Sequence, residues 1–266
     1  MTILLLILII PTLSTLLTYT IYCYEEANEQ NAPVQSFLLP ALRTALRSVV
    51  SETIILICHP LGFFPILRKE CGKKEQPLVV LAHGLFHNPA AWIFFGLILR
   101  RQGFATICLQ YPSFGQNLET TVENIRQSLE HIINAYPSRP IHLIGHSLGG
   151  LLLRAAVADM PPKTIRTLTT LGTPFGGSKL SVFTLSSLGQ YLRWNGPDVT
   201  AIRKKNFPQH VKGLCLYSPV DNMVLPNRAL HCELTNWTKK ATQPISQVAM
   251  LFSRKVIQEV IDFIRQ

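Results

Sequence analysis

A glycine-rich pentapeptide that follows an apolar run constrains this chain more than any other feature. The run at 141–144 leads into Gly145–Gly149 (GHSLG), and helix-forming residues begin at Gly150. This pattern predicts a strand, a tight turn on small residues and a helix that starts at once. Glycines are needed because side chains would clash in so tight a turn. The turn raises the Ser147 hydroxyl above the sheet, at a helix N-terminus where negative charge is favoured.

Strand-like and helix-like segments alternate from residue 77 onward. Apolar runs predict strands at 78–82, 104–109, 141–144, 165–171 and 211–217, with a last strand at 229–234. Helical periodicity predicts helices at 89–101, 118–135, 148–159 and 252–264. This alternation predicts an α/β fold, a mostly parallel sheet with helices on both faces. The stretch 174–208 interrupts the alternation and is rich in Gly, Ser and Pro, so we expect a lid-like insertion there.

Residues 1–24 are an apolar segment without a charged side chain. The segment is long enough to cross a bilayer, which takes about 20 residues. Tyr19, Tyr22 and Tyr24 at its end fit an interfacial aromatic belt. A cleaved signal peptide is the competing interpretation, although no Lys or Arg precedes the apolar run. We expect an uncleaved single-pass membrane anchor, as in a bacterial inner-membrane protein, and the flanking charges leave the side of the membrane open.

Residues 25–76 are expected to connect this anchor to the sheet domain as a helical segment. Apolar side chains recur at helical spacing between Leu38 and Val50, with Arg43 and Arg47 on the other face. Such an amphipathic helix is expected to lie either on the membrane or on the sheet domain. The polar stretch 72–77 marks the boundary, so the sheet domain is expected to span residues 77–266.

Composition narrows the possible partners. The chain is 47% hydrophobic and 15% charged, which is typical of a globular protein rather than a disordered one. Its net charge of +10 favours an anionic membrane surface, because Lys and Arg are scattered and no nucleic-acid-binding motif is present. A merely basic soluble surface is the alternative. The six cysteines show no metal-ligand spacing, so no metal site is expected, and the oligomeric state stays open.

Two further segments supply candidate site residues. Leu85 follows His83-Gly84 at the end of the first strand. Its amide and that of Leu148, the residue after the serine, would form an oxyanion hole, although an ordinary strand-to-loop turn is the alternative. Asp221 follows the strand 211–217, in the expected chain order of serine, acid and base. A turn-forming Asp-Asn pair is the other interpretation of Asp221.

Together these segments resemble the α/β-hydrolase lipases and esterases of the bacterial triacylglycerol-lipase type. The resemblance covers residues 78–264 and implies a serine nucleophile, an aspartate, a histidine, and lipid or ester substrates without a cofactor. The matching pieces are His83-Gly84 with Asn88–Trp92 (NPAAW), the GHSLG elbow, Leu171–Gly177 (LGTPFGG), Asp221 with Met223–Pro226 (MVLP), and Met250–Ser253 (MLFS).

The chain departs from this family at the catalytic histidine. In the family a Gly-His pair stands a few residues before the segment that matches Met250–Ser253, and here Ser246-Gln247 takes that place. Glutamine is an amide that accepts no proton near neutral pH, so Gln247 cannot be the general base. His231, expected inside the last strand, and His87, in the oxyanion loop, are the substitutes. His146 is expected to point away from the site.

Two functions of different classes remain open. The first is a membrane-anchored serine carboxylic ester hydrolase for lipid or acyl-ester substrates, in which Ser147 attacks the carbonyl and Asp221 orients an unassigned base. The second is a catalytically impaired homologue that serves as a membrane-anchored binding or regulatory protein. Acyl transfer on the same serine is not separated from hydrolysis by the sequence. The complete elbow favours the hydrolase, and Gln247 favours the binding protein.

Overall fold

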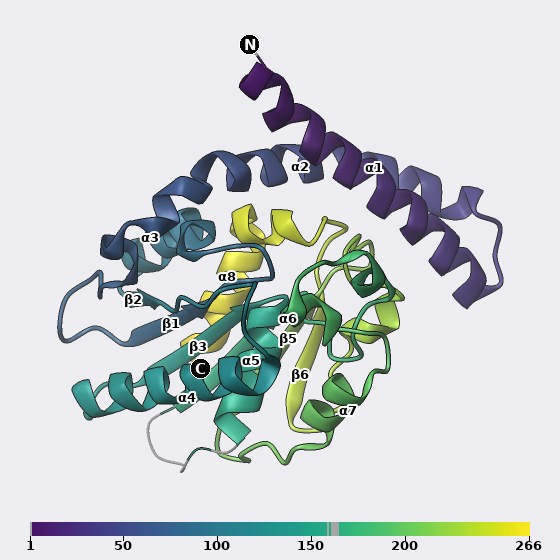
Figure 1. Cartoon of the computed structure of the whole chain (residues 1–266). Helices are drawn as coiled ribbons and strands as arrows, with labels where there is room; N and C mark the ends of the chain where they lie inside the picture. The colour runs from purple at the N-terminus through teal and green to yellow at the C-terminus, as the bar shows by residue number, and fades with distance from the viewer. Residues whose placement is uncertain (1, 159, 161–164) are drawn as a thin grey trace.

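A parallel sheet forms the centre of the molecule (Figure 1). The computed structural model describes residues 2–158, 160 and 165–266. All neighbouring strands of the sheet run parallel, in the order β2-β1-β3-β4-β5-β6. The predicted α/β alternation is therefore confirmed. The strands are β1 (Leu78–Ala82), β2 (Ala105–Cys108), β3 (Ile141–His146), β4 (Ile165–Leu171), β5 (Lys212–Tyr217) and β6 (Trp237–Ala241).

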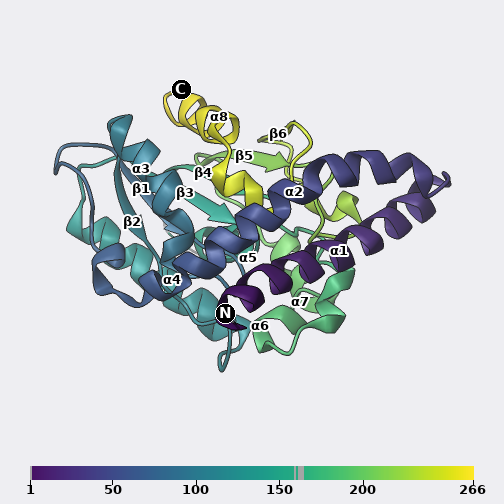
Figure 2. The same cartoon turned by 90° about the horizontal axis from the view of Figure 1, so that it is seen from above.

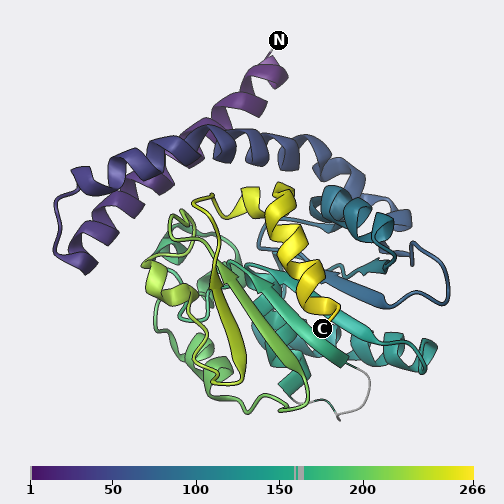
Figure 3. The same ribbon diagram turned by 180° about the vertical axis from the view of Figure 1, so that it is seen from behind.

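Helices cover both faces of the sheet (Figures 1 and 3). One core contains buried residues of α4 (Leu118–Ala135) and α5 (Leu148–Ala158), and the other contains those of α3 (Ile93–Arg101) and α8 (Arg254–Ile264). Alternate side chains of a strand point to opposite faces. Strand β1 therefore contributes Val80 to the first core and Val79 to the second. A strand buried on both faces is a rigid support for the loops that follow it.

The last strand lies further along the chain than predicted. The predicted strand at 229–234 is wrong, because Asn227–Leu230 is a 3₁₀ turn, η5. Strand β6 follows at Trp237–Ala241 and pairs with β5 at the edge of the sheet. Its side chains from Thr238 to Ala241 are exposed. An exposed edge strand needs no apolar run, so hydrophobic periodicity did not reveal it.

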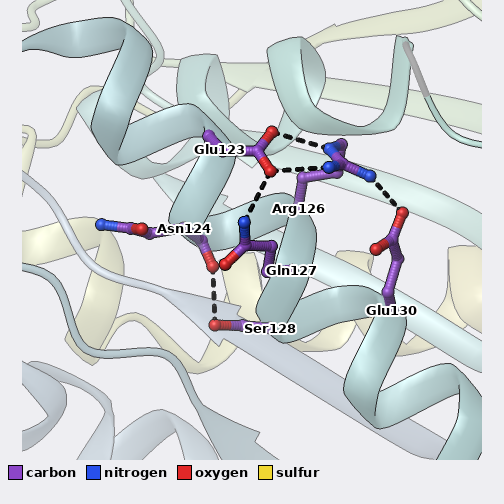
Figure 4. A network of polar contacts seen from close by, with 6 residues as sticks. All are labelled: Glu123, Asn124, Arg126, Gln127, Ser128 and Glu130. Carbon is purple, nitrogen blue, oxygen red and sulfur yellow. Dashed lines mark hydrogen bonds and ion pairs between the residues drawn. The ribbon is translucent and has the colours of Figure 1, made fainter.

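The outer face of α4 is a charged surface. Figure 4 shows Arg126 between two acidic side chains one helical turn away. Its Nη2 lies 2.6 Å from Glu123 Oε1, and its Nη1 contacts Glu130. Arg126 Nε also donates to Glu123 Oε2 at 2.8 Å, and Gln127 Nε2 donates a third hydrogen bond to Glu123, at 2.7 Å. Such pairs at spacings of three and four residues are typical of a helix that faces water.

Two long N-terminal helices form a hairpin across the carboxyl ends of the strands (Figures 1 and 2). They are α1 (Thr2–Gln30) and α2 (Gln35–Cys58), and two 3₁₀ turns, η1 (His59–Phe63) and η2 (Pro65–Arg68), lead from α2 toward β1. Among the described residues, Leu6–Gln30 is the one segment long and apolar enough to cross a membrane, and 33% of its apolar window is buried against protein.

Helix α2 presents an unexpected face to the protein. Its buried residues are mostly small or hydroxylated: Ala41, Thr44, Ser48, Ser51 and Ile55. The leucine and valine side chains that carry the helical periodicity are exposed instead: Leu38, Leu39, Leu42, Leu46 and Val50. The structure has a helix at Gln35–Cys58, and the leucine side chains on which the prediction of an amphipathic helix rested do not lie on the sheet domain.

The second half of α1 packs on the protein. Tyr19 and Tyr22 are buried, and the Tyr22 hydroxyl donates to the Pro219 carbonyl at 3.2 Å. Thr44 Oγ1 of α2 donates to the Tyr19 hydroxyl at 2.7 Å. The prediction of an interfacial aromatic belt is therefore wrong for these two side chains, because both are used in protein contacts. Tyr24 alone among the three is exposed.

Acidic residues fasten the end of α1 to the sheet domain. Glu25 pairs with Lys179 at 2.5 Å, and Glu29 pairs with Arg228 at 3.0 Å. Glu26 Oε1 accepts a hydrogen bond from a backbone amide of the sheet domain. The hairpin is consequently a fixed part of the fold rather than a free tether.

The insertion at 174–208 consists of short helical turns. They are η4 (Lys179–Phe183), α6 (Ser187–Gln190) and α7 (Pro197–Lys204). The buried Arg154 guanidinium of α5 donates to carbonyls at the end of α7, including that of Arg203 at 2.9 Å. Because charged donors form strong hydrogen bonds, this side chain holds the insertion against the sheet domain.

Candidate active site

Ser147 stands on a strained turn between β3 and α5. Its φ of +52° lies in the left-handed region, which a residue with a side chain rarely adopts. Two hydrogen bonds hold the turn: Ser147 N–H donates to the Leu171 carbonyl at 2.8 Å, and Thr173 Oγ1 donates to the Ser147 carbonyl at 3.0 Å. Backbone strain of this kind clusters at functional sites, where the surrounding structure maintains it. The structure thus has the strand, turn and helix that the pentapeptide predicts.

Glycines let two backbone segments meet at this turn. A Cβ atom on Gly149 would stand 2.3 Å from the Ala82 carbonyl oxygen, so no larger residue fits there. A Cβ atom on Gly84 would stand 3.2 Å from Ser147 Cβ and 3.0 Å from His146 Nδ1. The loop after β1 therefore lies directly against the serine.

The two predicted oxyanion donors are at this meeting point. Leu148 is the first residue of α5, so its amide has no partner within the helix. Leu85 follows Gly84 and lines the same cavity as Ser147. The next residue, Phe86, has a φ of +61° and donates its N–H to Ser113 Oγ at 2.8 Å. This second strained residue fixes the path of the loop that carries Leu85.

Ser147 opens onto a largely apolar cavity of about 530 Å³. Its walls come from the loop after β1, the insertion, the loop after β6, and both helices of the N-terminal hairpin. The hairpin contribution includes Ile10 and Leu17 of α1, and Ile55 and Leu56 of α2. Nothing in the local sequence of these helices indicated that they complete the serine's pocket.

Three histidines line this cavity, although the sequence pointed to only one of them. They are His59, His87 and His146. The rings of His87 and His146 stack in parallel, with centroids 5.7 Å apart. His146, expected to point away, lines the cavity as well. His231 is exposed, packs its ring on Tyr217 and does not line the cavity.

Two of these histidines, His87 and His146, are neutral at pH 7. Burial lowers the pKa of His87 to about 3 and that of His146 to about 4. His146 Nε2 lies 3.2 Å from the Gln247 carbonyl, which can only accept, so Nε2 carries the hydrogen. The Nδ1 atoms of His87 and His146 are buried without a partner among the described residues. Unpartnered buried nitrogens of this kind are candidates for proton transfer.

Gln247 occupies the place predicted for the histidine, and its side chain is bound to the backbone instead of acting as an acid or base. Its side-chain Nε2 donates to the Gly172 carbonyl at 2.8 Å. Gly172 has a φ of +56°, and a Cβ on it would stand 3.0 Å from Gln247 Cγ and 3.2 Å from Asp221 Oδ2. Gln247 and Asp221 are therefore neighbours across Gly172, but no hydrogen bond joins their side chains among the described contacts.

Asp221 is fully buried beside this glutamine. Its Oδ1 accepts from the amides of Met223 and Val224, both at 2.9 Å, whereas its Oδ2 has no partner among the described residues. Burial raises the pKa of Asp221 to about 7, and the two amides offset only part of that rise. The carboxyl group thus lacks the N–H donor that a triad histidine supplies.

Glu52 of α2 also lines the cavity and was missed by the sequence reasoning. Its Oε1 accepts from Ser48 Oγ at 2.9 Å and from Thr15 Oγ1 at 3.2 Å, which joins the two helices. One turn along α1, Thr18 Oγ1 accepts from Asn222 Nδ2 at 2.8 Å. The sequence did contain a sign of Glu52, because it is the one charged residue between Ser48 and Cys58.

Comparison with known proteins identifies the same fold. The family described as the alpha/beta hydrolase fold matches residues 77–217. Among curated proteins, the chain is 28% identical to methylesterase 17 of Arabidopsis thaliana over 96 residues, which are 34% of this chain and 35% of that protein. It is 30% identical to GPI inositol-deacylase of Candida albicans over 116 residues, which are 42% of this chain and 25% of that protein. The matches thus span about a third or less of these relatives.

Solved structures show the same fold. The monoacylglycerol lipase of Paleococcus ferrophilus matches with a TM-score of 0.54 at 16% identity, over 73% of this chain and 97% of that structure. The likeness concerns the arrangement of helices and strands. No group of three or more His, Cys, Asp or Glu residues placed to hold a metal occurs in the part of the chain that the structure describes.

Proposed function

We propose that this chain, which belongs to the α/β hydrolase fold family, is a serine carboxylic ester hydrolase acting on lipid or acyl-ester substrates at a membrane. The observation that carries the proposal is Ser147 on its strained elbow, against the Leu85 segment and open to an apolar cavity of about 530 Å³. An apolar pocket with few polar groups suits an acyl chain. The esterase and lipase names of similar proteins support the same reaction class.

Each step of the reaction has a candidate group. Ser147 Oγ attacks the ester carbonyl while its proton passes to a base, and the amides of Leu85 and Leu148 bind the oxyanion of the tetrahedral intermediate. The intermediate collapses as the alcohol leaves with that proton. Water then attacks the acyl-serine in the same way, which releases the carboxylic acid and restores Ser147.

We assign the base to His87. It lines the cavity with Ser147, its Nδ1 is unpartnered, and its ring is neutral at pH 7. A base works best when its pKa is near the working pH, so a pKa of about 3 implies slow turnover. Asp221 keeps the family position of the acid, but it has no histidine to orient. The chain is therefore proposed to be a working but slow hydrolase.

We place the site at a membrane because of α1. Residues Leu6 to Tyr24 carry no charge, and several of their leucines are exposed. A relative of this chain is named as a deacylase of GPI inositol. An anchor in α1 would bring Ser147 next to lipid substrates, because Ile10 and Leu17 of the same helix line the cavity.

The test is hydrolysis of p-nitrophenyl butyrate by the full-length chain in detergent micelles, with Ser147→Ala as the comparison. Full length is required because α1 and α2 line the cavity. We expect turnover in the wild type and its loss in Ser147→Ala, and covalent labelling by a fluorophosphonate only where Ser147 is present. A wild type that neither labels nor exceeds Ser147→Ala would remove the proposal.

The second candidate is a catalytically impaired binding protein. One contact favours it: Gln247, which stands where the family has its base, donates its Nε2 hydrogen bond to the Gly172 carbonyl. In that case the wild type and Ser147→Ala would bind a fluorescent fatty-acyl ester equally well, and neither would hydrolyse it.

A further inference from the structure

Among the described residues, the exposed side chains that line the Ser147 cavity are all large and apolar, and we take them to ring its mouth. Of the described residues that line the cavity, those classed as exposed come from α1, α2, the oxyanion loop and the insertion. They are Ile10 at 53%, Leu17 at 53%, Leu56 at 37%, Phe86 at 46% and Phe183 at 66% exposed. No exposed polar or charged side chain is among the described lining residues. A cavity that received its substrate from water would expose an apolar ring of this kind at a cost in free energy.

We call this ring of exposed side chains the mouth. Further exposed apolar side chains contact it or lie close to it in the sequence. Phe114 contacts Phe86, with ring centroids 5.5 Å apart. Leu185, two residues beyond Phe183, is 92% exposed, and Ile57, next to Leu56, is 56% exposed. Contiguous apolar surface around a binding site marks a contact with a partner or a membrane.

The packing between the two hairpin helices points to lipid rather than to a protein partner. The residues that α2 buries are mostly small or hydroxylated, and its leucines face outward. Helices in a bilayer pack in this manner, because small residues allow close approach and no hydrophobic driving force draws leucines together. The ring is also continuous with α1, which is long and apolar enough to cross a membrane.

We propose that the mouth sits in the bilayer, so that α2 and the tip of the insertion enter the lipid together with α1. The substrate is then a membrane-resident ester with a long acyl chain, which reaches Ser147 sideways from the lipid and not from water. This inference rests on the proposed hydrolase function for its substrate, while the position of the mouth is testable without catalysis.

Position is tested with single tryptophan substitutions in the inactive Ser147→Ala chain, reconstituted in phosphatidylethanolamine and phosphatidylglycerol vesicles. Leu185→Trp on the insertion and Ile57→Trp on α2 probe the surface near the mouth, one or two residues from Leu56 and Phe183. Leu97→Trp on α3 is the matched control, since Leu97 is exposed but does not line the cavity. With brominated lipids, we expect quenching of the added fluorescence at positions 185 and 57 and none at 97. No quenching at 185 and 57, or equal quenching at all three, would overturn the proposal.

The route of the substrate is tested in the active chain with Leu185→Asp, Ile57→Asp and Leu97→Asp. These side chains lie outside the cavity lining, so hydrolysis of soluble p-nitrophenyl butyrate should stay within about twofold of the wild type in all three. Hydrolysis of a long-chain ester embedded in vesicles should fall about 10-fold or more in the first two, because a charge resists entry into lipid. Equal vesicle activity in the three variants would contradict entry from the lipid. Absence of all hydrolysis, with quenching retained, would reject the enzyme but keep the lipid-embedded mouth.

Discussion

The two halves of the candidate site are built in different ways. On the elbow side, Ser147 is held by backbone hydrogen bonds and by glycines that admit no Cβ atom. On the acid side, Asp221 Oδ2 has no partner, and Gln247 Nε2 bonds to the Gly172 carbonyl. The elbow depends on many packed backbone atoms, whereas the acid–base pair depends on one side chain. A single substitution can therefore remove the pair and leave Ser147 in place.

The largest expected effect tests whether the elbow side has its own base. His87→Ala should lower kcat by about 10²- to 10⁴-fold, the usual contribution of a general base. The measurement is p-nitrophenyl butyrate hydrolysis, with fluorophosphonate labelling as a second readout. His231→Ala is the matched control, because that ring is exposed and lies outside the cavity, and it should be neutral. An unchanged rate in His87→Ala would assign the base to another group.

The next largest effect concerns Asp221, whose Oδ2 has no partner among the described residues. Asp221 has a pKa of about 7 when folded and about 4 when unfolded, so the folded state holds its proton more tightly. Its contribution is fully present below pH 4, is lost as pH rises to 7, and changes little above that. The loss amounts to at most about 4 kcal/mol, at 1.4 kcal/mol for each pKa unit.

Asp221→Asn removes this pH dependence, because an amide does not titrate in this range. The fold should tolerate the change, because the amide oxygen can still accept from Met223 and Val224. Thermal unfolding between pH 5 and 8 should show wild-type stability falling with pH and a flatter profile for the variant. Asp198→Asn, a substitution on α7 outside the cavity lining, is the control and should follow the wild type. A wild-type profile as flat as that of Asp221→Asn would mean that Asp221 is already ionised and paired.

A smaller effect tests the packing of the elbow. Gly149→Ala would place a methyl group 2.3 Å from the Ala82 carbonyl oxygen, between backbones that cannot move apart without displacing β1. We expect a loss of about 3 kcal/mol in stability, at the upper end for overpacking. Gly115→Ala is the control: its methyl group meets nothing within 4 Å, and only its φ of +77° costs about 1 kcal/mol. Thermal unfolding that ranks the two equally would contradict this view of the elbow.

The smallest expected effect would join the two halves. Gln247→His places an imidazole beside Asp221, where its N–H can meet the free Oδ2. We expect kcat to rise by about 10- to 100-fold, at the lower end for a general base because the loop is adapted to glutamine. Gln247→Asn is the comparison and should bring no gain. No increase in Gln247→His would show that more than one side chain separates the acid side from a working triad.

Local signals in the sequence predicted the sheet and the elbow. Strand β4 and helix α4 have the predicted bounds, because apolar runs and helical periodicity are properties of neighbouring residues. Strand β6 was missed because an exposed edge strand carries little hydrophobic signal. The hairpin's place at the site depends on contacts such as that of Tyr22 with Pro219, separated by 197 positions. No local pattern records contacts of that kind, and the positions of His59 and His146 were missed for the same reason.

The hairpin also determines when the site comes into existence. The cavity is lined by residues from Ile10 to Val248, so its first walls leave the ribosome long before its last. Early in synthesis, the apolar side chains of α1 and α2 are therefore uncovered, because the insertion and the loop after β6 have not yet been made. If the helices enter a membrane as they emerge, the sheet domain folds against a surface already in place. In that case the pocket is completed on the bilayer. Because Val248 lines the pocket, no N-terminal fragment that ends before residue 248 contains all of it.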